Sequence, residues 1–203
     1  MERFPPIPPS RRTAEQQALC DHYQAGWRAQ LRSPDGRLGG TLDTLLRSPS
    51  LARRVSDLTD YFRNGTSLDQ RINEFAILIA ARLHDSQYEW AVHSQWALQA
   101  GLDRRLVTAL GEGREPQSLQ ADERAVYALL MELARTQTVG AATFEQARAV
   151  FSEQQLVDLV VVFGAYRMIA GLLALADVQP AQAVTPALTP QGIDDAARSH
   201  SGL

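Results

Sequence analysis

The pattern of apolar and polar positions along the chain is typical of helices. No stretch alternates apolar and polar residues over the length of a strand, and no hairpin turn separates two such stretches. Turn signals such as SPDG at residues 33–36 and the pair Asn64-Gly65 divide the chain into segments of helical length. The β-branched run at residues 160–163 lies inside a much longer apolar segment, which favours helix there as well. We therefore predict an all-α fold.

Caps and turn residues set the expected bounds of the helices. Thr13 and Ser67 are suitable N-caps, and Pro49 suits the first turn of a helix. We expect helices over residues 13–31, 49–62, 68–84, 85–101, 102–110, 121–137, 143–151 and 152–176, with one short helix before Ser48.

These helices are expected to form one domain over residues 13–176, flanked by two irregular segments. Residues 1–12 are proline-rich and should form an irregular arm that is disordered or lies on a neighbouring surface. Residues 177–203 are rich in Pro, Ala, Gln and Ser and have little to bury, so we expect a tail that is disordered or packed on a partner subunit. A chain of 203 residues, 45% of them hydrophobic, can form one such domain with its own core.

The last predicted helix raises the question of a membrane. Residues 156–176, LVDLVVVFGAYRMIAGLLALA, are apolar and long enough to cross a bilayer. Asp158 and Arg167 lie within this segment, and a mid-span arginine costs about 2.5–3.5 kcal/mol on insertion scales. We therefore expect a central helix buried by its own domain or by a partner subunit, and no membrane partner. The N-terminus lacks the apolar core of a signal peptide, so the expected location is the cytoplasm.

Two absences in the composition exclude whole classes of chemistry. All 20 basic residues are arginine, which excludes a Schiff-base lysine and a P-loop lysine. Cys20 is the only cysteine, so the chain has no intrachain disulfide, no C-x-x-C redox pair and no cysteine-based zinc site. The net charge of -3 gives no electrostatic reason to expect nucleic acid as a partner.

Residues 85–101, DSQYEWAVHSQWALQAG, combine Ser86, Glu89 and His93 within two to three helical turns. At 100° per residue, Ser86 and His93 fall within about 60° of Glu89, so the three share one stripe. Alanines and a tryptophan border this stripe, whereas glutamines occupy much of the opposite side. We therefore expect the polar stripe to face inward, which is the reverse of an ordinary amphipathic helix.

The preceding helix carries a second candidate residue. Glu74 opens the run EFAILIAA, which is apolar at every following position. A glutamate at the edge of such a surface is partly desolvated, which suits a proton carrier near neutral pH. Two helices joined by a tight turn can face each other, which would bring Glu74 towards Glu89 and His93. These three residues are the candidate catalytic group.

The spacing also permits two other interpretations. Glu89 and His93 form an i,i+4 pair of the kind that occurs on many exposed helices, and Arg71 and Glu74 could form an i,i+3 salt bridge. Such ion pairs outnumber catalytic ones. Two glutamates and a histidine could also hold a cation, but the chain has Glu-x-x-x-His once, where di-iron bundles have Glu-x-x-His twice. We assign no metal site on this pattern.

The assembled motifs resemble a known superfamily. Residues 71–110, RINEFAILIAARLHDSQYEWAVHSQWALQAGLDRRLVTAL, are similar to the carboxymuconolactone decarboxylase superfamily, which also contains the alkylhydroperoxidase D-like (AhpD-like) proteins. The motifs R-x-x-E, Y-E-W-x-x-H and A-x-x-x-G carry the resemblance, which extends in weaker form over residues 40–176. It implies an all-α protein that forms homotrimers or homohexamers, with its site on a helix pair near subunit contacts.

The peroxidase-like branch of this superfamily has a glutamate followed by C-x-x-C-x-x-x-H. On this chain the glutamate falls on Glu74, the cysteines fall on Ser86 and Glu89, and the histidine falls on His93. Because both cysteine positions are replaced, we do not expect thiol-dependent peroxide reduction. The chain is more similar to the decarboxylase branch, which carries Glu and His at the last two of these positions.

Resemblance to the decarboxylase branch implies the loss of carbon dioxide from a small lactone acid, with delivery of a proton to carbon. Glu89 or His93 would then donate the proton, and Glu74 would set the tautomer of the histidine. Arg71 would anchor a carboxylate of the substrate.

Three further residues are candidates for substrate contacts. Ser86 lies on the polar stripe, and Trp90 could form one wall of the site. Tyr166, in the last helix, could offer its hydroxyl, although a buried tyrosine more often binds a backbone carbonyl. Tyr88 falls off the stripe, and we expect it only to pack.

Our hypothesis is a cytoplasmic, oligomeric enzyme that performs decarboxylation or proton transfer on a small organic acid without a cofactor. The alternative is a non-catalytic scaffold or ligand-binding protein that kept the fold after losing the redox cysteines. An enclosed pocket lined by Glu89 and His93 would favour the enzyme, whereas a solid core would favour the scaffold.

Overall fold

The computed structural model describes residues 3–24, 28 and 38–191. No strand occurs among these residues, and the predicted all-α fold is confirmed for this part of the chain. The elements are the 3-10 helix η1 (Pro9–Arg11) and the α-helices α1 (Ala14–Tyr23), α2 (Gly40–Leu45), α3 (Pro49–Asn64), α4 (Gln70–Leu83), α5 (Gln87–Gln99), α6 (Arg104–Gly111), α7 (Ala121–Thr136), α8 (Ala141–Arg148) and α9 (Glu153–Ala176).

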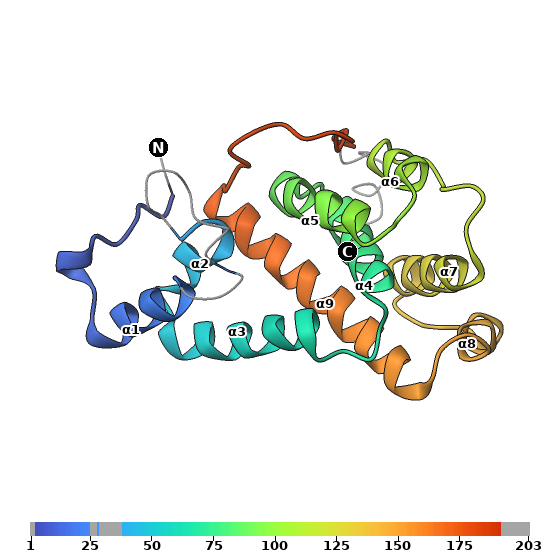
Figure 1. Cartoon of the computed structure of the whole chain (residues 1–203), viewed down its shortest axis with the longest axis horizontal. Helices are drawn as coiled ribbons and strands as arrows, with labels where there is room; N and C mark the ends of the chain where they lie inside the picture. Colours follow the sequence, from blue (N-terminus) through green and yellow to red (C-terminus); the bar gives the residue numbers. More distant parts are fainter. Residues whose placement is uncertain (1–2, 25–27, 29–37, 192–203) are drawn as a thin grey trace, which may run out of the picture.

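Helix α4 is the most deeply buried helix and lies at the centre of the main core. Every residue from 72 to 82 is buried, as expected for a helix that is apolar around its circumference. α4 packs against α5 and α9 and also contacts α6 and α7. Figure 1 shows α9 running diagonally across the molecule, with α3 on one side and the α4–α5 pair on the other.

Helix α9 is long and apolar enough, by length and composition, to cross a membrane. Its Asp158, however, is buried with three hydrogen bonds: Tyr61 Oη donates at 2.8 Å, and Ser67 donates from both its backbone N and its Oγ at 2.9 Å. The carboxylate of Asp158 is hydrogen-bonded to α3 and to the loop before α4, and these bonds hold α9 in the protein core.

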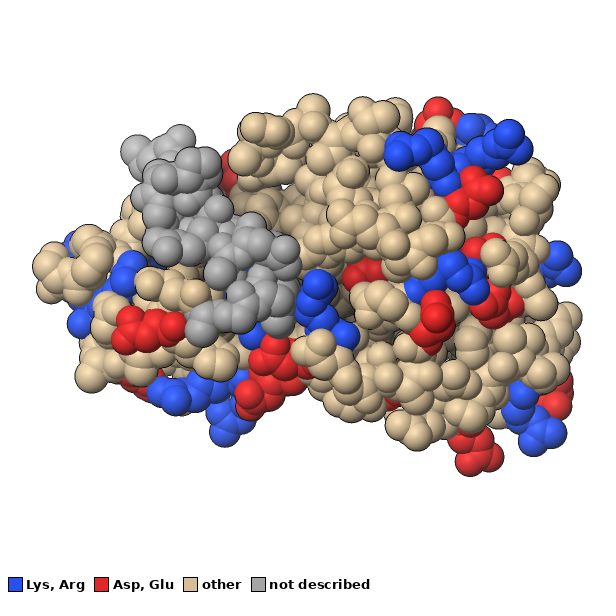
Figure 2. Space-filling view, in the orientation of Figure 1, with Lys and Arg blue, Asp and Glu red and all other residues tan. Residues whose placement is uncertain are grey.

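The domain buries only one side of α9. Val157, Val161, Met168 and Leu175 lie on the other side, with exposed fractions of 63%, 42%, 43% and 55%. Their spacing of four and seven residues places them on one stripe of the helix. In the single chain, α9 therefore presents an apolar face to solvent. Elsewhere on the side shown in Figure 2, arginines and acidic residues are interspersed.

Most predicted helix bounds agree with the structure to within a few residues, but one cap differs. Asp69, not Ser67, caps α4, because its Oδ1 accepts a hydrogen bond from the backbone N of Arg71 at 2.9 Å. Ser67 instead binds Asp158. The first helix ends at Tyr23, with Gln24 as its C-cap. The rest of its predicted length, like the SPDG turn, lies outside the described residues except for Arg28.

Residues 3–12 form the irregular N-terminal arm expected from the sequence, and they pack on this chain. Arg3 Nη1 donates to the carbonyl of Ala174 at 3.0 Å, at the end of α9. Arg47 Nη2 donates to the carbonyl of Pro5 at 2.6 Å, and its guanidinium lies 4.8 Å from the centre of the Phe4 ring. The arm thus covers the end of the domain formed by α2 and α9.

Residues 177–191 form an extended segment, here called the C-terminal strap, that packs over α5 and α6 (Figure 1). Trp90 Nε1 donates to the carbonyl of Pro186 at 2.9 Å, and Arg82 Nη1 donates to the carbonyls of Gly111 and Thr189 at 2.9 and 2.7 Å. The prediction of a disordered or partner-bound tail is therefore wrong for these residues. Two buried side chains hold the strap by hydrogen bonds to its carbonyls: Arg82 on α4 and Trp90 on α5. Their partners lie about 100 positions further along the chain. Residues 192–203 lie outside the described part.

Replacing the buried Arg82 should weaken the attachment of the C-terminal strap. We expect Arg82→Met to lower the free energy of unfolding by about 2–3 kcal/mol, since two carbonyls lose a charged donor. Arg104→Met, at an exposed position on α6, is the matched control and should change stability by less than about 0.5 kcal/mol. Urea denaturation of both variants measures the difference, and equal stabilities would contradict this account.

Candidate functional site

A tight turn between α4 and α5 brings the predicted residues together. The backbone N of Ser86 donates to the carbonyl of Ala81 at 2.9 Å and that of Asp85 to the carbonyl of Arg82 at 3.2 Å, which is the pattern of a Schellman motif. Asp85 takes the left-handed position with φ 48°. α5 begins directly after this turn, so the two helices run antiparallel in contact. Because Ser86 belongs to the turn, it lies outside the cavity described below.

Glu74, His93 and Glu89 form a buried cluster, here called the carboxylate–histidine cluster. Glu74 Oε2 lies 2.7 Å from His93 Nδ1, and Glu89 Oε2 lies 3.3 Å from His93 Nε2. All three residues are buried: Glu74 is 1% exposed, His93 5% and Glu89 6%. Gln70 Nε2 donates to the other carboxylate oxygen of Glu74 at 2.8 Å, which orients that carboxylate.

The two carboxylates control the charge of the histidine. Burial lowers the pKa of His93, but the charges and hydrogen bonds of Glu74 and Glu89 outweigh burial and raise this pKa to about 9. His93 is therefore an imidazolium at neutral pH, with a proton on each ring nitrogen. A proton held between an imidazole and two carboxylates can be delivered to a bound molecule and taken back, which is the requirement for general acid–base catalysis.

A cavity of about 590 Å³, including its open mouth, lies against Glu89 and His93. Its walls come from α2, α3, α5 and α9 and are mainly apolar and aromatic. The aromatic lining residues are Tyr88, Trp96 and Tyr166. A concave, mostly apolar site with a few convergent polar groups is the usual form of a small-molecule site.

Tyr166 and Trp96 fix the plane of the imidazole. The Tyr166 ring lies 4.8 Å from His93 at an interplanar angle of 82°, and the Trp96 ring lies 5.0 Å away at 79°. Burial, followed by the charges of Glu89 and Glu74, raises the pKa of Tyr166 well above its usual value. Its hydroxyl therefore stays protonated at the wall of the cavity.

Tyr88 also lines the cavity, where the sequence analysis expected it only to pack. Burial, with smaller effects from Glu89 and Asp43, raises the pKa of Tyr88 to about 12, so it remains a neutral phenol. A Cβ atom on Gly40, which has φ 51°, would lie 2.8 Å from the Tyr88 ring. Glycine at this position thus lets α2 close against the tyrosine.

The structure does not place Arg71 or Trp90 in the cavity. Arg71 Nη1 lies 2.5 Å from Glu123 and its Nη2 lies 2.5 Å from Asp122, so this guanidinium joins α4 to the start of α7. The predictions that Arg71 anchors a substrate carboxylate or pairs with Glu74 are therefore wrong, because Arg71 pairs with Asp122 and Glu123 instead. Trp90 points to the C-terminal strap, and the wall that we assigned to it is provided by Trp96.

Arg28 is a lining residue that the sequence analysis missed. Its side chain is 5% exposed and borders the same cavity as His93. An arginine in a predicted helix is usually solvated, and its burial here depends on contacts with α3 that are distant in sequence. No local signal identifies it.

A second, smaller pocket, of about 230 Å³ including its open mouth, also borders the imidazole. Gln70, Asn73, Glu74 and His93 contribute to its lining. Asn73 Oδ1 is buried and has no hydrogen-bond partner among the described residues. The carboxylate–histidine cluster therefore separates two cavities, with Glu89 facing the larger and Glu74 facing the smaller.

The cluster is not arranged around a common point where a cation could bind. Glu74 and Glu89 contact opposite nitrogens of the His93 ring, so their oxygens do not converge. Among the described residues, no group of three or more His, Cys, Asp or Glu side chains has the arrangement of a metal site.

The raised pKa of His93 predicts how stability depends on pH. The imidazolium contributes stability in full below pH 6.5, its ordinary pKa, and this contribution is lost as the pH rises through about 9. The lost contribution is on the order of 3 kcal/mol. Urea denaturation between pH 6 and 10 should show this fall in the wild type and not in His93→Gln. The same pH dependence in both proteins would contradict the assignment.

The sequence matches no protein-family model and no curated protein, but three solved structures share its fold. An uncharacterized peroxidase-related protein from Silicibacter sp. TM1040 has a TM-score of 0.69 at 16% identity and covers 87% of this chain and 89% of its own. An uncharacterized peroxidase-related protein from Ralstonia eutropha JMP134, described as an alkylhydroperoxidase AhpD core, has a TM-score of 0.67 at 12% identity. The match covers 88% of this chain and 92% of that protein. A protein of unknown function from Agrobacterium tumefaciens, described as a candidate AhpD antioxidant defence protein, has a TM-score of 0.60 at 20% identity. The match covers 69% of this chain and 97% of that protein. The chain therefore has the AhpD-like fold that the sequence resemblance predicted.

Proposed function

We propose that the chain is a cytoplasmic acid–base enzyme that decarboxylates a small lactone or enol-type organic acid and needs no cofactor. The observation that carries the proposal is a buried histidine held between two carboxylates at the wall of a cavity. An enclosed pocket lined by Glu89 and His93 is the feature expected to favour an enzyme over a scaffold with a solid core. The cavity is lined by both residues but has an open mouth, so it supports the enzyme over a solid-cored scaffold without being fully enclosed.

The reaction would consume one proton. The carboxylate of the substrate leaves as carbon dioxide, the electron pair of the broken bond remains on carbon, and a proton from the cluster completes the product. Glu89 pairs with His93 Nε2 and both residues line the cavity, so either residue can hand over this proton. Glu74 keeps the opposite nitrogen bonded and therefore holds the ring in one orientation.

The lining of the cavity supports loss of the carboxylate charge. Leu42, Val55 and Ile169 contribute apolar surface, and Trp96 adds an aromatic wall. A carboxylate held against such surface is less well solvated than in water. Its conversion to neutral carbon dioxide is correspondingly favoured.

The peroxidase-related descriptions of the structural neighbours do not suit this site. Thiol-dependent peroxide reduction needs a reactive cysteine beside the histidine. Here the corresponding position is Glu89, and the chain's only cysteine, Cys20, is buried in the separate core formed around α1 and α2. The acid–base groups of the fold are present at the site without the thiols.

Removal of either proton carrier at the cavity should abolish turnover. We expect His93→Gln and Glu89→Gln to reduce kcat by about 10²–10⁴-fold, while Gln99→Ala, on the exposed side of α5, should keep wild-type activity. The assay follows carbon dioxide release and deuterium incorporation from D₂O with a panel of carboxylated lactones and enol acids. Unchanged activity in both cluster variants would refute the enzyme, and ligand binding without turnover would favour the non-catalytic alternative.

We also propose that the chain self-associates as a homotrimer or homohexamer, supported by the exposed apolar face of α9. Light scattering at micromolar concentration should give a multiple of the monomer mass. Met168→Glu should lower that mass because it places a charge on this face, whereas Gln99→Glu, at an exposed position on α5, should not. A monomeric wild-type protein would contradict the proposal.

A further inference from the structure

Two tyrosine hydroxyls border the larger cavity without a hydrogen-bond partner. Tyr88 on α5 and Tyr166 on α9 both line this cavity beside His93. Neither hydroxyl makes a hydrogen bond within the part of the chain that the structure describes. Because a buried tyrosine hydroxyl normally finds a partner, one that lacks a partner and borders a cavity is a candidate for contact with a ligand.

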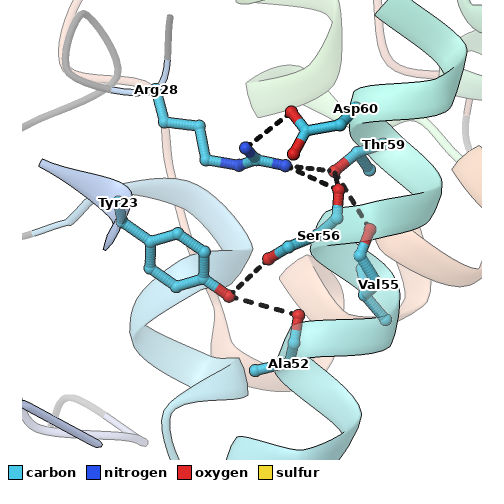
Figure 3. Close-up of polar contacts among 7 residues, drawn as sticks. All are labelled: Tyr23, Arg28, Ala52, Val55, Ser56, Thr59 and Asp60. Atoms are coloured by element: carbon cyan, nitrogen blue, oxygen red, sulfur yellow. Dashed lines mark hydrogen bonds and ion pairs between the residues drawn. The ribbon is translucent and has the colours of Figure 1, made fainter. Parts of the chain in front are cut away.

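Tyr23 provides the contrast of a buried tyrosine with a structural role (Figure 3). Its hydroxyl accepts a hydrogen bond from Ser56 Oγ at 2.7 Å and donates to the carbonyl of Ala52 at 3.2 Å. Both partners lie on α3, so the hydroxyl ties α1 to that helix. Tyr166 is similarly buried, at 8% exposed, but removal of its hydroxyl would break no hydrogen bond among the described residues.

The hydroxyl of Tyr166 lies on the side of the larger cavity. Tyr166 borders both spaces, but Glu89 lines only the larger cavity and Glu74 only the smaller pocket. Burial raises the pKa of Tyr166 most, followed by the charge of Glu89 and then by that of Glu74. The stronger effect of Glu89 indicates that the hydroxyl is nearer to the larger cavity. The ring of Tyr166 lies 4.8 Å from that of His93, which keeps the hydroxyl close to the proton carrier.

Tyr88 reaches the same cavity from α5. Its ring packs against α2, because a Cβ atom on Gly40 would lie 2.8 Å from the ring and 2.9 Å from the hydroxyl oxygen. Gly40 also lines the cavity, so the hydroxyl lies at the cavity wall. Burial, and then the charge of Glu89, raises the pKa of Tyr88 to about 12. Both phenols are thus neutral at pH 7 and lie within electrostatic reach of Glu89.

We propose that Tyr88 and Tyr166 donate hydrogen bonds to a carbonyl oxygen of the substrate and stabilise the negative charge that forms on it. The inference rests on the proposed function, because it names the groups that stabilise the intermediate of that same reaction. It also narrows the substrate to an acid whose carbonyl group lies β to the carboxylate.

The charge on this oxygen follows from the bond that breaks. When the carboxylate leaves as carbon dioxide, the electron pair of the broken bond moves onto the carbonyl oxygen and forms an enolate. A proton from His93 or Glu89 then goes to carbon, and the carbonyl group forms again. Both phenols keep their own protons throughout. Hydrogen-bond donors that are fixed before the reaction stabilise such an oxyanion without reorganisation, and the contacts with His93 and Gly40 fix these two rings.

Binding of acetophenone and of its isosteric hydrocarbon α-methylstyrene tests the two donors without any turnover. The probes have the same shape, but only acetophenone carries a carbonyl acceptor. In NMR titrations at pH 7, Tyr166→Phe and Tyr88→Phe should each weaken acetophenone by about 3- to 10-fold, as expected for one neutral hydrogen bond, and leave α-methylstyrene within about twofold. Tyr127→Phe, on α7 and outside the lining of both spaces, is the matched control and should change neither affinity.

Infrared spectroscopy of bound acetophenone with a ¹³C-labelled carbonyl reports the contact directly. The carbonyl stretch should lie at a higher wavenumber in Tyr166→Phe and in Tyr88→Phe than in the wild type, because a hydrogen bond to the oxygen is lost. Urea denaturation separates this role from a structural one. Tyr166→Phe should keep the wild-type midpoint, whereas Tyr23→Phe should lower it because its hydroxyl makes two hydrogen bonds.

Three results would overturn the proposal: no binding of acetophenone by the wild-type protein, wild-type acetophenone affinity and carbonyl stretch in either cavity variant, or an equal loss of affinity for both probes. A lowered urea midpoint for Tyr166→Phe would also overturn it, because the hydroxyl would then have a structural role. The two proposals fail separately. An inactive enzyme leaves these affinities as expected, whereas a failed carbonyl contact leaves the activity loss of His93→Gln intact.

Discussion

The mutual neutralisation of Glu74, His93 and Glu89 is the interaction on which the site depends. None of the three can be charged alone in the core without a desolvation cost of several kcal/mol. With Nδ1 on Glu74 at 2.7 Å and Nε2 facing Glu89 at 3.3 Å, one imidazolium compensates two carboxylates. The group therefore shares one mobile proton, and it can only form if α4 and α5 are held face to face.

The rest of the fold supplies that constraint. The Schellman turn at Asp85 sets the start of α5, and α9 packs along α4, with Tyr166 at the edge of the imidazole. On the outer side, the C-terminal strap binds Arg82 of α4 and Trp90 of α5. Helices α2 and α3 then complete the larger cavity, so that a proton carrier in the core meets a space where a small molecule can bind.

Features decided by local periodicity could be predicted from the sequence. The helical spacing of Glu89 and His93 placed them on one inward stripe, and the tight turn after α4 placed Glu74 opposite them, as the structure has them. Ser86 shares that stripe only on an ideal helix. In the structure Ser86 closes the turn, because α4 ends at Leu83, three residues before Ser86, in the hydrogen bonds of a Schellman motif.

Features decided by long-range partners could not be predicted. Arg71 is occupied by two acidic residues at the start of α7, Trp90 is directed outward by a carbonyl of the C-terminal strap, and Arg28 is buried by polar groups of α3. Each partner lies roughly 30 to 100 positions away along the chain, and spacing within one helix carries no information about it. The AhpD-like fold could be predicted because its motifs lie within one helix pair. The lining of the cavity could not, because it comes from helices that are distant in the sequence.

The charge state of His93 tests the central claim most directly. Nitrogen NMR of the ¹⁵N-labelled imidazole reports the protonation of Nδ1 and Nε2 separately, with His93→Gln used to assign the signals. The account predicts that both nitrogens carry a proton at pH 7 and that the ring titrates near pH 9. A His93 ring that is neutral at pH 7, with a single protonated nitrogen, would contradict it.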